Sequence, residues 1–530
     1  GTTSASMNIS GRTSHLRETM RASLALPRHE AVTEGDEPTP RSRSLEVTHV
    51  FTPAFPVRIA SLALAGLLVA GTAAIAAPET PAADEGSAGQ VVPPTVTTTL
   101  RNQLGFTFPE APAVPEGPAD DALVAALDTL FSSLQEGVDG EALRDIADSE
   151  DPRAAWLLSD LVRFLSTGDA RDISVGAFEV LTGAQLSEDP VALRSPWQSM
   201  TDHLIAWDLP APPDYTRWKA QLYTLVDPRW QAFFDDEDAT IDWRLVSWGG
   251  VLMDDRAFGD AGTCELGCIP ALDDPAVTDA DAGDWYPDDS TVVGLTVDGE
   301  SRACPRHIME IHEMVNDELG GRRLAIPYCT LCGSAQAYFT DDVEAAEEMP
   351  VLRTSGLLSR SNQVMFDLPT RSVFDTFTGE ALSGPLRDAG VELEQTTVVT
   401  STWGEWKAAH PETTIIAEDG GIGRSYRFDP LRGRDDDGPI FPVGDVDERL
   451  AVQEKVLGVI TDDGQSLAFP VAAARAALEA GDAVSALGVS VVPDASGLRA
   501  TREDGSEVVG HEAFWFAWSQ FYPETLVWVP

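Results

Sequence analysis

The sequence predicts an α+β protein in which an all-helical unit is followed by a β-rich domain with an internally duplicated core. Three observations predict this class. Apolar residues recur at helical spacing between residues 119 and 241. From about Asp242 onward they give way to short β-rich runs separated by Gly, Asp and Pro. Hydrophobic residues make up 43% of the 530 residues, with 13 Trp and 20 Phe, which is enough to bury a sizeable core.

The helical unit is predicted over residues 119–241. Helix starts are expected at Asp151-Pro152 and again at Asp189-Pro190, because Asp caps a helix and Pro fits its first position. The two starts lie about 40 residues apart, which is the period of HEAT or armadillo helix pairs. An ordinary helical bundle explains the same pattern equally well.

The β-rich domain is predicted over residues 242–530. A hairpin is expected over residues 292–305, because Asp298-Gly299 is a strong hairpin turn signal. A helix is predicted from Pro305 to about Leu319, followed by a strand over residues 324–329 that runs into a tight turn.

Two pairs of matching segments predict that this domain is internally duplicated. The hairpin around Asp298-Gly299 recurs around Asp463-Gly464. The segment 403–413 matches 515–525, with Trp, Trp, Pro, Glu and Thr at identical spacing. The segments come in the same order in both halves, and chance recurrence is the alternative.

The chain before residue 119 predicts export. The apolar run 58–77 lies behind Arg58 and ends in the small residues Ala74-Ile75-Ala76, the pattern of a secretory signal peptide. An uncleaved membrane anchor is the alternative, since the run is nearly long enough to span a bilayer. Residues 1–57 are expected to be a disordered or non-native leader, and residues 78–118 a Pro-rich linker. The expected location is secreted or extracytoplasmic, in the periplasm or cell envelope.

The charge of the chain excludes one class of partner. Acidic residues number 86 and basic residues 36, giving a formal net charge of −50. A chain this acidic repels phosphate, so no nucleic-acid partner is expected. Membrane contact is expected only through residues 58–77, if they stay uncleaved.

Five cysteines offer the strongest chemical signal. Cys264 and Cys268 could close a small local disulfide, which leaves Cys329 and Cys332 as the remaining natural pair. Cys304 corresponds to Phe469 in the duplication and is expected to be a buried thiol. A C-x-x-C turn can hold a reversible disulfide, or it can give two thiolates to a soft metal ion.

His312 is the best candidate for a third metal ligand. If the helix ran on to Leu319 and the next strand returned, Cys329 would arrive near the level of His312. Cys329, Cys332 and His312 together would suit Cu(I) or Zn with one position open. The alternative is a core histidine bonded to a backbone carbonyl. His307, Cys304 and Glu313 are secondary candidates. His307 lies outside the apolar arc, Cys304 is expected in the core, and adjacent helical residues such as His312 and Glu313 point apart.

The ordered motifs of this region resemble a known family. They are His312-Glu313-Met-Val-Asn316-Asp317, Pro327-Tyr-Cys329-Thr-Leu-Cys332-Gly-Ser-Ala335, Thr354-Ser-Gly, Ser361-Asn, Val364-Met-Phe-Asp367 and Trp403-Gly-Glu-Trp406. Together they resemble the bacterial domain of unknown function 3179 family over about residues 242–530. The resemblance implies an exported protein and places His and the two Cys in the family pattern, but it implies no activity.

This sequence departs from the family pattern in several places. Ile311 stands where an aromatic residue is usual, Cys304 where Tyr is common and Phe374 where Trp is usual. Leu368-Pro369 replaces an Arg-containing stretch.

Three functions compete at the level of sequence. The first is an exported protein that binds Cu or Zn through Cys329, Cys332 and His312. The second is a thiol–disulfide redox protein that uses the two cysteines. The third is a scaffold module with structural cysteines that binds an unknown protein or envelope partner. No catalytic residue is assigned, because no G-x-S-x-G elbow, Walker A loop or dinucleotide fingerprint occurs.

Overall fold

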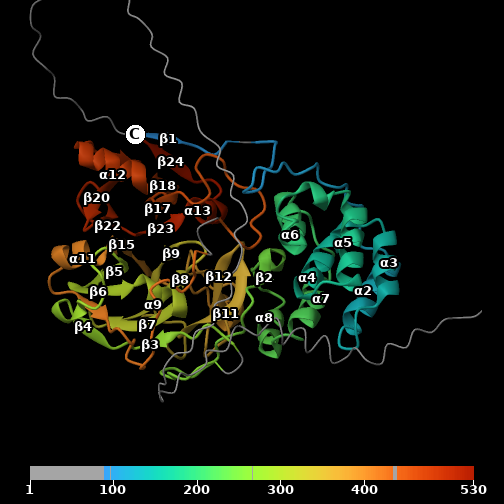
Figure 1. The fold of residues 1–530 in the computed structure, drawn as a ribbon, viewed down its shortest axis with the longest axis horizontal. Coiled ribbons are helices and arrows are strands. Elements are labelled where there is room, and N and C mark those ends of the chain that lie inside the picture. The colour runs from blue at the N-terminus through green and yellow to red at the C-terminus, as the bar shows by residue number, and fades with distance from the viewer. Residues whose placement is uncertain (1–88, 96, 265–266, 434–437) are drawn as a thin grey trace, which may run out of the picture. The chain divides into compact units, whose positions relative to one another are not determined.

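The computed structural model describes residues 89–530, apart from 96, 265–266 and 434–437 (Figure 1). The predictions for residues 1–57 and 58–77, and for the start of the linker, lie outside this part of the chain. All described residues belong to one compact unit. Within them, no helix has both the length and the hydropathy needed to cross a bilayer.

The first part of the fold is helical, as predicted. Asp120, Asp139 and Ser195 cap helices by accepting backbone N–H bonds, and Asp151 caps a short 3-10 turn that leads into the next helix. Asp189 does not start a helix; it is buried, and its carboxylate accepts from Asn102, Val191 and Ser199. The helices are α2 (Asp121–Ser132), α3 (Gly140–Asp148), α4 (Ala155–Phe164), α5 (Asp169–Thr182), α6 (Pro196–Ala206), α7 (Tyr215–Tyr223) and α8 (Gln231–Phe234).

The helices share their core with a four-stranded sheet. This sheet has the order β13-β12-β11-β2. Side chains such as Trp248, Leu357 and Phe366 from the sheet pack in the same apolar cluster as Trp156 and Trp218 from the helices. The predicted boundary at Asp242 therefore marks a change of secondary structure and not a break in the core. The strands are β2 (Val246–Trp248), β11 (Leu352–Ser359), β12 (Asn362–Asp367) and β13 (Val373–Phe374).

Two five-stranded sheets share one topology. One has the order β15-β5-β6-β16-β4 and the other β23-β17-β18-β24-β1, and in each only the third and fourth strands pair in parallel. The strands of the first are β4 (Val277–Asp279), β5 (Thr291–Val297), β6 (Glu300–Pro305), β15 (Val399–Thr402) and β16 (Thr414–Ile416). Those of the second are β1 (Gln90–Val92), β17 (Lys455–Ile460), β18 (Ser466–Pro470), β23 (Gly510–Phe514) and β24 (Leu526–Val529).

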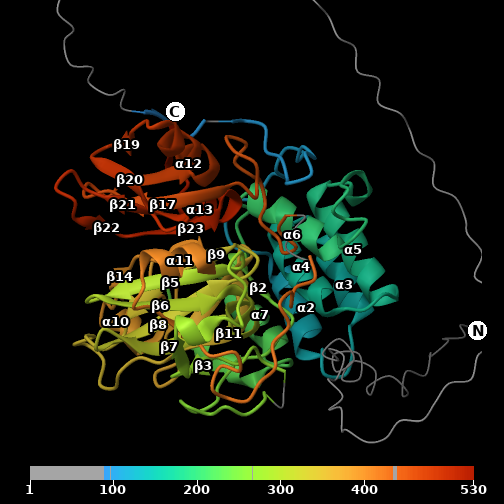
Figure 2. The same ribbon diagram turned by 60° about the vertical axis from the view of Figure 1, so that its left-hand side comes forward.

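Equivalent helices also follow equivalent strands, as the labels in Figure 1 show, and Figure 2 gives the same ribbon from a second side. Helices α9 (Arg306–His312) and α12 (Val471–Ala480) follow β6 and β18, and α11 (Trp403–Ala409) and α13 (Trp515–Phe521) follow β15 and β23. The indole N–H of Trp406 donates to Thr413 over 3.0 Å, and that of Trp518 donates to Thr525 over 2.9 Å. This shared topology is what a duplication would produce, while descent of both halves from one ancestral unit stays a prediction.

Each half carries extra strands between its first and second helix. In the first half these strands are β7 to β14. Of these, β14, β10, β8 and β7 form a sheet with β9 paired to β8, and β3, which precedes α9 in the chain, pairs with β7 at its edge. The second half inserts β19-β20-β21-β22. The remaining elements are β3 (Leu272–Asp273), β7 (Met314–Leu319), β8 (Arg322–Cys329), β9 (Ser334–Ala335), β10 (Ala337–Phe339), α10 (Gly384–Asp388), β14 (Gln395–Thr396), β19 (Val484–Ala486), β20 (Val489–Asp494), β21 (Gly497–Thr501) and β22 (Glu507–Val508).

The helix predicted over residues 305–319 is wrong in its second half. Helix α9 ends at His312, because Glu313 takes a left-handed conformation with φ of 52°. Residues 314–319 then form β7, which pairs with β8 in the register Met314 to Pro327. The two glycines at 320–321 form the turn of this hairpin and do not end a helix.

The described part of the predicted linker packs against the folded unit. Residues 90–92 form the edge strand β1, Phe108 is buried, and the carbonyl of Pro109 accepts the indole N–H of Trp207 over 2.8 Å. Proline excludes a central strand but not an edge strand, and apolar side chains between the prolines can still be buried.

Candidate functional site

The C-x-x-C motif forms a buried turn between β8 and β9. Cys329 ends β8 and pairs directly with Ser334, which begins β9. The two sulfur atoms lie 2.7 Å apart, with Cys329 3% exposed and Cys332 fully buried. Gly333 closes the turn with φ of 57°, a conformation that glycine adopts without steric cost.

A hairpin turn with strained backbone angles places a carbonyl oxygen close to both sulfur atoms. Strands β11 and β12 are joined by Arg360 and Ser361, which have φ of 48° and 69°. Two-residue turns of this kind are usually built from Asn and Gly, so two ordinary residues here cost conformational energy. The Ser361 carbonyl oxygen lies 3.7 Å from the sulfur of Cys329 and 3.3 Å from that of Cys332, where it can accept from a thiol.

A carboxyl group beside this turn belongs to Glu313. The hairpin register brings the Glu313 backbone beside Tyr328, whose N–H donates to the Glu313 carbonyl over 2.9 Å. The hydroxyl of Thr330, inside the C-x-x-C turn, donates to the Glu313 carboxylate over 3.1 Å. Burial raises the pKa of Glu313 to about 7. At neutral pH this carboxyl group can therefore both take up and release a proton beside the cysteine pair.

The second half of the β-rich domain holds the cysteine turn from the other side. The backbone N–H of Phe514 donates to the Cys332 carbonyl over 2.8 Å, and the Lys455 ammonium donates to the Gly333 carbonyl. Burial is the main cause that raises the pKa of the Cys332 thiol well above its usual range, followed by the neighbouring Cys329. Cys332 is thus held as a neutral thiol while the pair is reduced.

Uncharged polar groups extend from the cysteines into the protein interior. Ala335, Ala337 and Phe339 pack in one apolar cluster, so the alternation of the chain directs Ser334 and Gln336 to the opposite face, beside Cys329. The hydroxyl of Ser334 and both amide atoms of Gln336 are buried without a hydrogen-bond partner among the described residues.

Two further segments add polar groups to this region. Met365 packs in the same apolar cluster as Tyr338, so alternation along β12 places Gln363 on that side as well. Both amide atoms of Gln363 and the hydroxyl of Ser361 lack a partner within the described chain, as does one nitrogen of His511. Native structures leave few buried polar groups unsatisfied, so this concentration makes the region around the cysteines the candidate functional site.

The sequence did not predict these polar groups. The only sequence signal for them is that Ser334, Ser361 and Asn362 belong to the motifs shared with the family, while Gln336 and Gln363 directly adjoin those motifs.

The structure does not bring His312 to the cysteine pair. Its Nδ1 lies 2.6 Å from the Pro270 carbonyl, which can only accept, so Nδ1 carries the proton. Burial lowers the pKa of His312 to about 4, and the neutral ring therefore accepts at Nε2 from the Tyr426 hydroxyl over 2.7 Å. Both ring nitrogens therefore have hydrogen-bond partners. This agrees with the alternative that His312 is a core histidine bonded to a backbone carbonyl.

Of the secondary candidates, Glu313 lies at the cysteine turn, whereas Cys304 and His307 lie elsewhere. Cys304 is fully buried in a different apolar cluster from Cys329 and Cys332, and burial raises its pKa to about 12. His307 stacks on Tyr286 with ring centroids 5.3 Å apart, and burial lowers its pKa to about 4.

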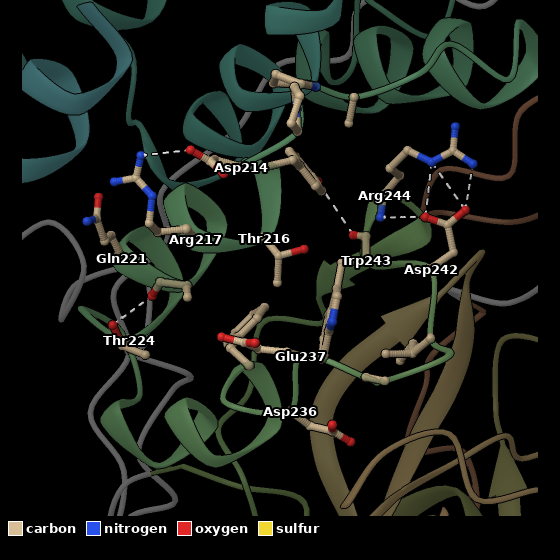
Figure 3. Close-up of a pocket in the computed structure, with 18 of the residues that line it drawn as sticks. Asp214, Thr216, Arg217, Gln221, Thr224, Asp236, Glu237, Asp242, Trp243 and Arg244 are labelled. Atoms are coloured by element: carbon tan, nitrogen blue, oxygen red, sulfur yellow. Dashed lines mark hydrogen bonds and ion pairs between the residues drawn. The ribbon is translucent and has the colours of Figure 1, made fainter. Parts of the chain in front are cut away.

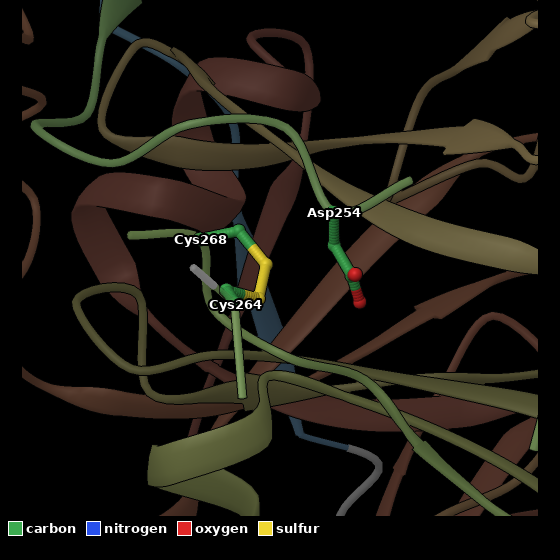
Figure 4. A group of neighbouring side chains, drawn as sticks. All are labelled: Asp254, Cys264 and Cys268. Atoms are coloured by element: carbon green, nitrogen blue, oxygen red, sulfur yellow. A yellow bond between two sulfur atoms is a disulfide. The ribbon is translucent and has the colours of Figure 1, made fainter. Parts of the chain in front are cut away.

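Cys264 and Cys268 are joined by a disulfide beside Asp254 (Figure 4). Ligand atoms of these three residues lie within 4.8 Å of one another, and within the described chain they are the one group of three or more such residues that could hold a metal ion. Oxidised sulfurs are poor metal ligands. The Asp254 carboxylate also already accepts from Arg256 over 2.8 Å and from the backbone N–H of Ala271 over 2.8 Å.

The helical part contains a separate cavity of about 990 Å³ (Figure 3). It is lined by α7, by the loop before it and by residues 231–244. Its two arginines are already paired: Arg217 contacts Asp214 over 3.4 Å, and Arg244 contacts Asp242 over 2.7 Å. The cavity has no group of chemical interest comparable to the cysteine pair.

One comparison with known proteins gives a match. Residues 266–507 match the family model described as protein of unknown function, DUF3179. The resemblance is confirmed. The match covers a shorter stretch than the 242–530 expected from the motifs, and it includes the cysteine pair, Glu313 and both polar segments. The chain matches no curated protein and no solved structure.

Proposed function

We propose that Cys329 and Cys332 form a thiol–disulfide redox centre in which Glu313 transfers the proton. The observation that carries this proposal is the 2.7 Å separation of two buried sulfurs beside a carboxyl group whose pKa is about 7. Sulfurs this close need little movement to form a bond of about 2.0 Å.

The reaction balances with a disulfide as the oxidant. The Cys329 thiolate attacks one sulfur of a partner disulfide, and the second partner sulfur leaves with the bonding electron pair. The Cys332 sulfur then attacks Cys329, which releases the first partner sulfur and closes the internal disulfide. Two electrons pass to the partner, and the two cysteine protons end on its two sulfurs. Glu313 takes a proton from a cysteine and returns it to a leaving sulfur.

Cys329 is the better attacking residue. It is the less buried of the two sulfurs, and Cys332 is stabilised as a neutral thiol by its surroundings. The partner that fits this reaction best is a disulfide-bearing protein in the same compartment. We include in the proposal that the protein acts on this partner as an enzyme.

Thiol labelling across glutathione and dithiothreitol buffers tests the redox centre. The full chain with Cys304→Ser removes the background thiol. We expect Cys329 and Cys332 to gain and lose label together at one potential within the range of biological thiol couples. A pair that stays fully oxidised or fully reduced over that whole range would refute the proposal, and Cys332→Ser serves as the control that cannot cycle.

Metal binding is the second candidate. The observation that favours it is the ligand group of Asp254, Cys264 and Cys268, which could take Zn or Cu once its disulfide is reduced. The set expected from the sequence, Cys329, Cys332 and His312, would first require His312 to release Tyr426.

Metal analysis of protein purified under reducing conditions separates the two sets. Loss of bound metal in Cys264→Ser identifies the first set, and loss in Cys329→Ser identifies the second. Protein that binds no stoichiometric Zn or Cu after reduction would refute this candidate.

We also propose that residues 58–77 direct export. The disulfide between Cys264 and Cys268 supports this, because oxidising compartments maintain such bonds. N-terminal sequencing of the protein recovered from the cell envelope or medium should read from Ala77, after the small residues at 74–76. Recovery in the cytosol with residues 58–77 intact would contradict export.

A further inference from the structure

A second cavity, of about 500 Å³, lies at α9, away from the cysteine pair. Segment 418–428 forms most of its wall, and Trp285 and His307 complete it. None of the residues that surround Cys329 and Cys332 lines it. The lining residues are Trp285, His307, Glu418, Asp419, Gly423, Arg424, Ser425, Tyr426 and Phe428.

Two side chains that line this cavity have a buried nitrogen without a partner. They are Nε1 of Trp285 and Nδ1 of His307, which find no hydrogen-bond partner among the described residues. His307 is only 3% exposed, so bulk water does not compensate. An indole N–H can only donate, so its partner must be a hydrogen-bond acceptor such as an oxygen atom.

The cavity also contains an arginine without a carboxylate partner. Arg424 is half-buried and forms no ion pair within the described residues. Its guanidinium carbon lies 5.6 Å from the Tyr426 ring, and the nearby Arg256 together with burial lowers its pKa. Glu418 and Asp419 are exposed, and neither contacts the guanidinium. We therefore expect the Arg424 guanidinium to pair with an anion from outside the chain.

A flat aromatic surface stands beside these polar groups. The rings of Tyr286, His307 and Phe428 form a cluster in which each contacts the other two. The centroids of His307 and Phe428 lie 4.9 Å apart with their planes inclined by 29°, and those of Tyr286 and Phe428 lie 6.0 Å apart. Phe428 is 55% exposed, so part of its ring is available to a ligand. Aromatic faces of this kind favour a flat apolar group at stacking distance.

Tyr426 fixes the wall between the charge and the aromatic stack. Its hydroxyl donates to Nε2 of His312, whose Nδ1–H donates in turn to the Pro270 carbonyl. These two hydrogen bonds hold Tyr426 in one orientation, with its ring toward Arg424. The histidine expected to bind a metal thus supports the cavity.

We propose that this cavity binds a small organic carboxylate that carries a flat unsaturated group. The carboxylate pairs with Arg424 and accepts from the indole N–H of Trp285, while the flat group lies against Phe428. A volume of about 500 Å³ accommodates a ligand with one ring. This site is independent of the redox centre proposed above.

Isothermal titration calorimetry of the full chain with benzoate, benzamide and inorganic phosphate tests the proposal. Benzamide has the shape of benzoate without the charge, and phosphate has the charge without the ring. We expect benzoate to bind at least about tenfold more tightly than either, since a charge-assisted hydrogen bond and the stacked ring both contribute.

Variants locate the site. Arg424→Gln should weaken benzoate binding by about tenfold or more, and Trp285→Phe by several-fold because only the indole N–H is lost. Arg427→Gln is the matched control, because Arg427 is exposed and does not line the cavity. Phe428→Ala removes an exposed ring, so it tests stacking without disturbing the core.

Three outcomes would overturn the proposal. Benzoate could show no saturable binding, phosphate or benzamide could bind as tightly as benzoate, or Arg427→Gln could weaken binding as much as Arg424→Gln. Circular dichroism melting of each variant shows that a loss of binding is not a loss of fold. If Arg424→Gln does not fold, unchanged benzoate binding by both Trp285→Phe and Phe428→Ala refutes the site.

Discussion

The carboxyl group of Glu313 should make the protein less stable as pH rises through neutrality. An unfolded chain releases this proton near pH 4.5, whereas burial raises the pKa in the folded protein to about 7. Between these values the folded protein keeps a proton that the unfolded chain has lost. The contribution of Glu313 to the free energy of unfolding is therefore fully present below pH 4.5. It falls by about 1.4 kcal/mol for each pH unit up to pH 7, a total loss of about 3 kcal/mol.

The substitution Glu313→Gln isolates this effect. Glutamine keeps an oxygen that can accept from Thr330 but stays neutral at every pH. We expect the stability of Glu313→Gln relative to the natural chain to rise by about 3 kcal/mol between about pH 4.5 and about pH 8. Urea unfolding of the oxidised protein, followed by tryptophan fluorescence at several pH values, measures this difference.

A flat difference across that pH range would refute the reasoning. It would mean that the Glu313 carboxyl is not enclosed, and the proton transfer proposed for it would lose its basis. The matched control is Glu405→Gln, because Glu405 is exposed on α11 and lies on a different element from the cysteine turn. Cycling of the cysteine pair in Glu313→Gln should also slow at neutral pH while its midpoint potential stays close to that of the natural chain.

Three further perturbations follow from the structure. Gly333→Ala should cost about 1–3 kcal/mol and slow cysteine cycling, because φ is 57° and a Cβ would lie 2.6 Å from the Lys455 ammonium; thermal melting and thiol labelling check this, and an unchanged melting temperature would contradict it. The double variant Cys264→Ser/Cys268→Ser should lose about 2 kcal/mol, the value for a short closed loop, and chemical unfolding with equal stability in both proteins would argue against the disulfide. Arg353→Met should lower the free energy of unfolding in urea by about 3–5 kcal/mol, because the buried guanidinium lies 2.7 Å from the buried carboxylate of Asp273, which would lose its cationic partner. A loss below about 1 kcal/mol would show that this ion pair is not needed.

Local signals in the sequence predict the hairpin at Asp298-Gly299 and the match between the two tryptophan segments. The turn at Asp298-Gly299 needs only its own residues, and the structure places β5 and β6 on either side of it. The segments of Trp406 and Trp518 match in their own spacing, and the structure forms a helix in each. In each case the information lies within about ten residues, so no tertiary contact is needed to read it.

The end of α9 could not be predicted in the same way. Helical periodicity continues through Val315, and Gly320-Gly321 resembles a helix stop. The pairing of β7 with β8 overrides this preference, because six residues of hydrogen-bonded register outweigh the weak helix propensity of the segment. The buried amides of Gln336 and Gln363 were also beyond prediction, since strands far apart in sequence bring them to one region.

This early helix end also explains why the structure places His312 away from the cysteine pair. The hairpin carries Cys329 back to the level of residues 312 and 313, as the helix-and-strand estimate expected, but through a different path. A residue leaving a helix and one entering a strand project in different directions, so neighbours at this point separate. Glu313 turns to Thr330 and the cysteines, while His312 turns to Tyr426 and the second cavity. A single left-handed residue therefore separates two regions of the protein, and the side chain beside the cysteines is a carboxyl group where the sequence predicted an imidazole ligand.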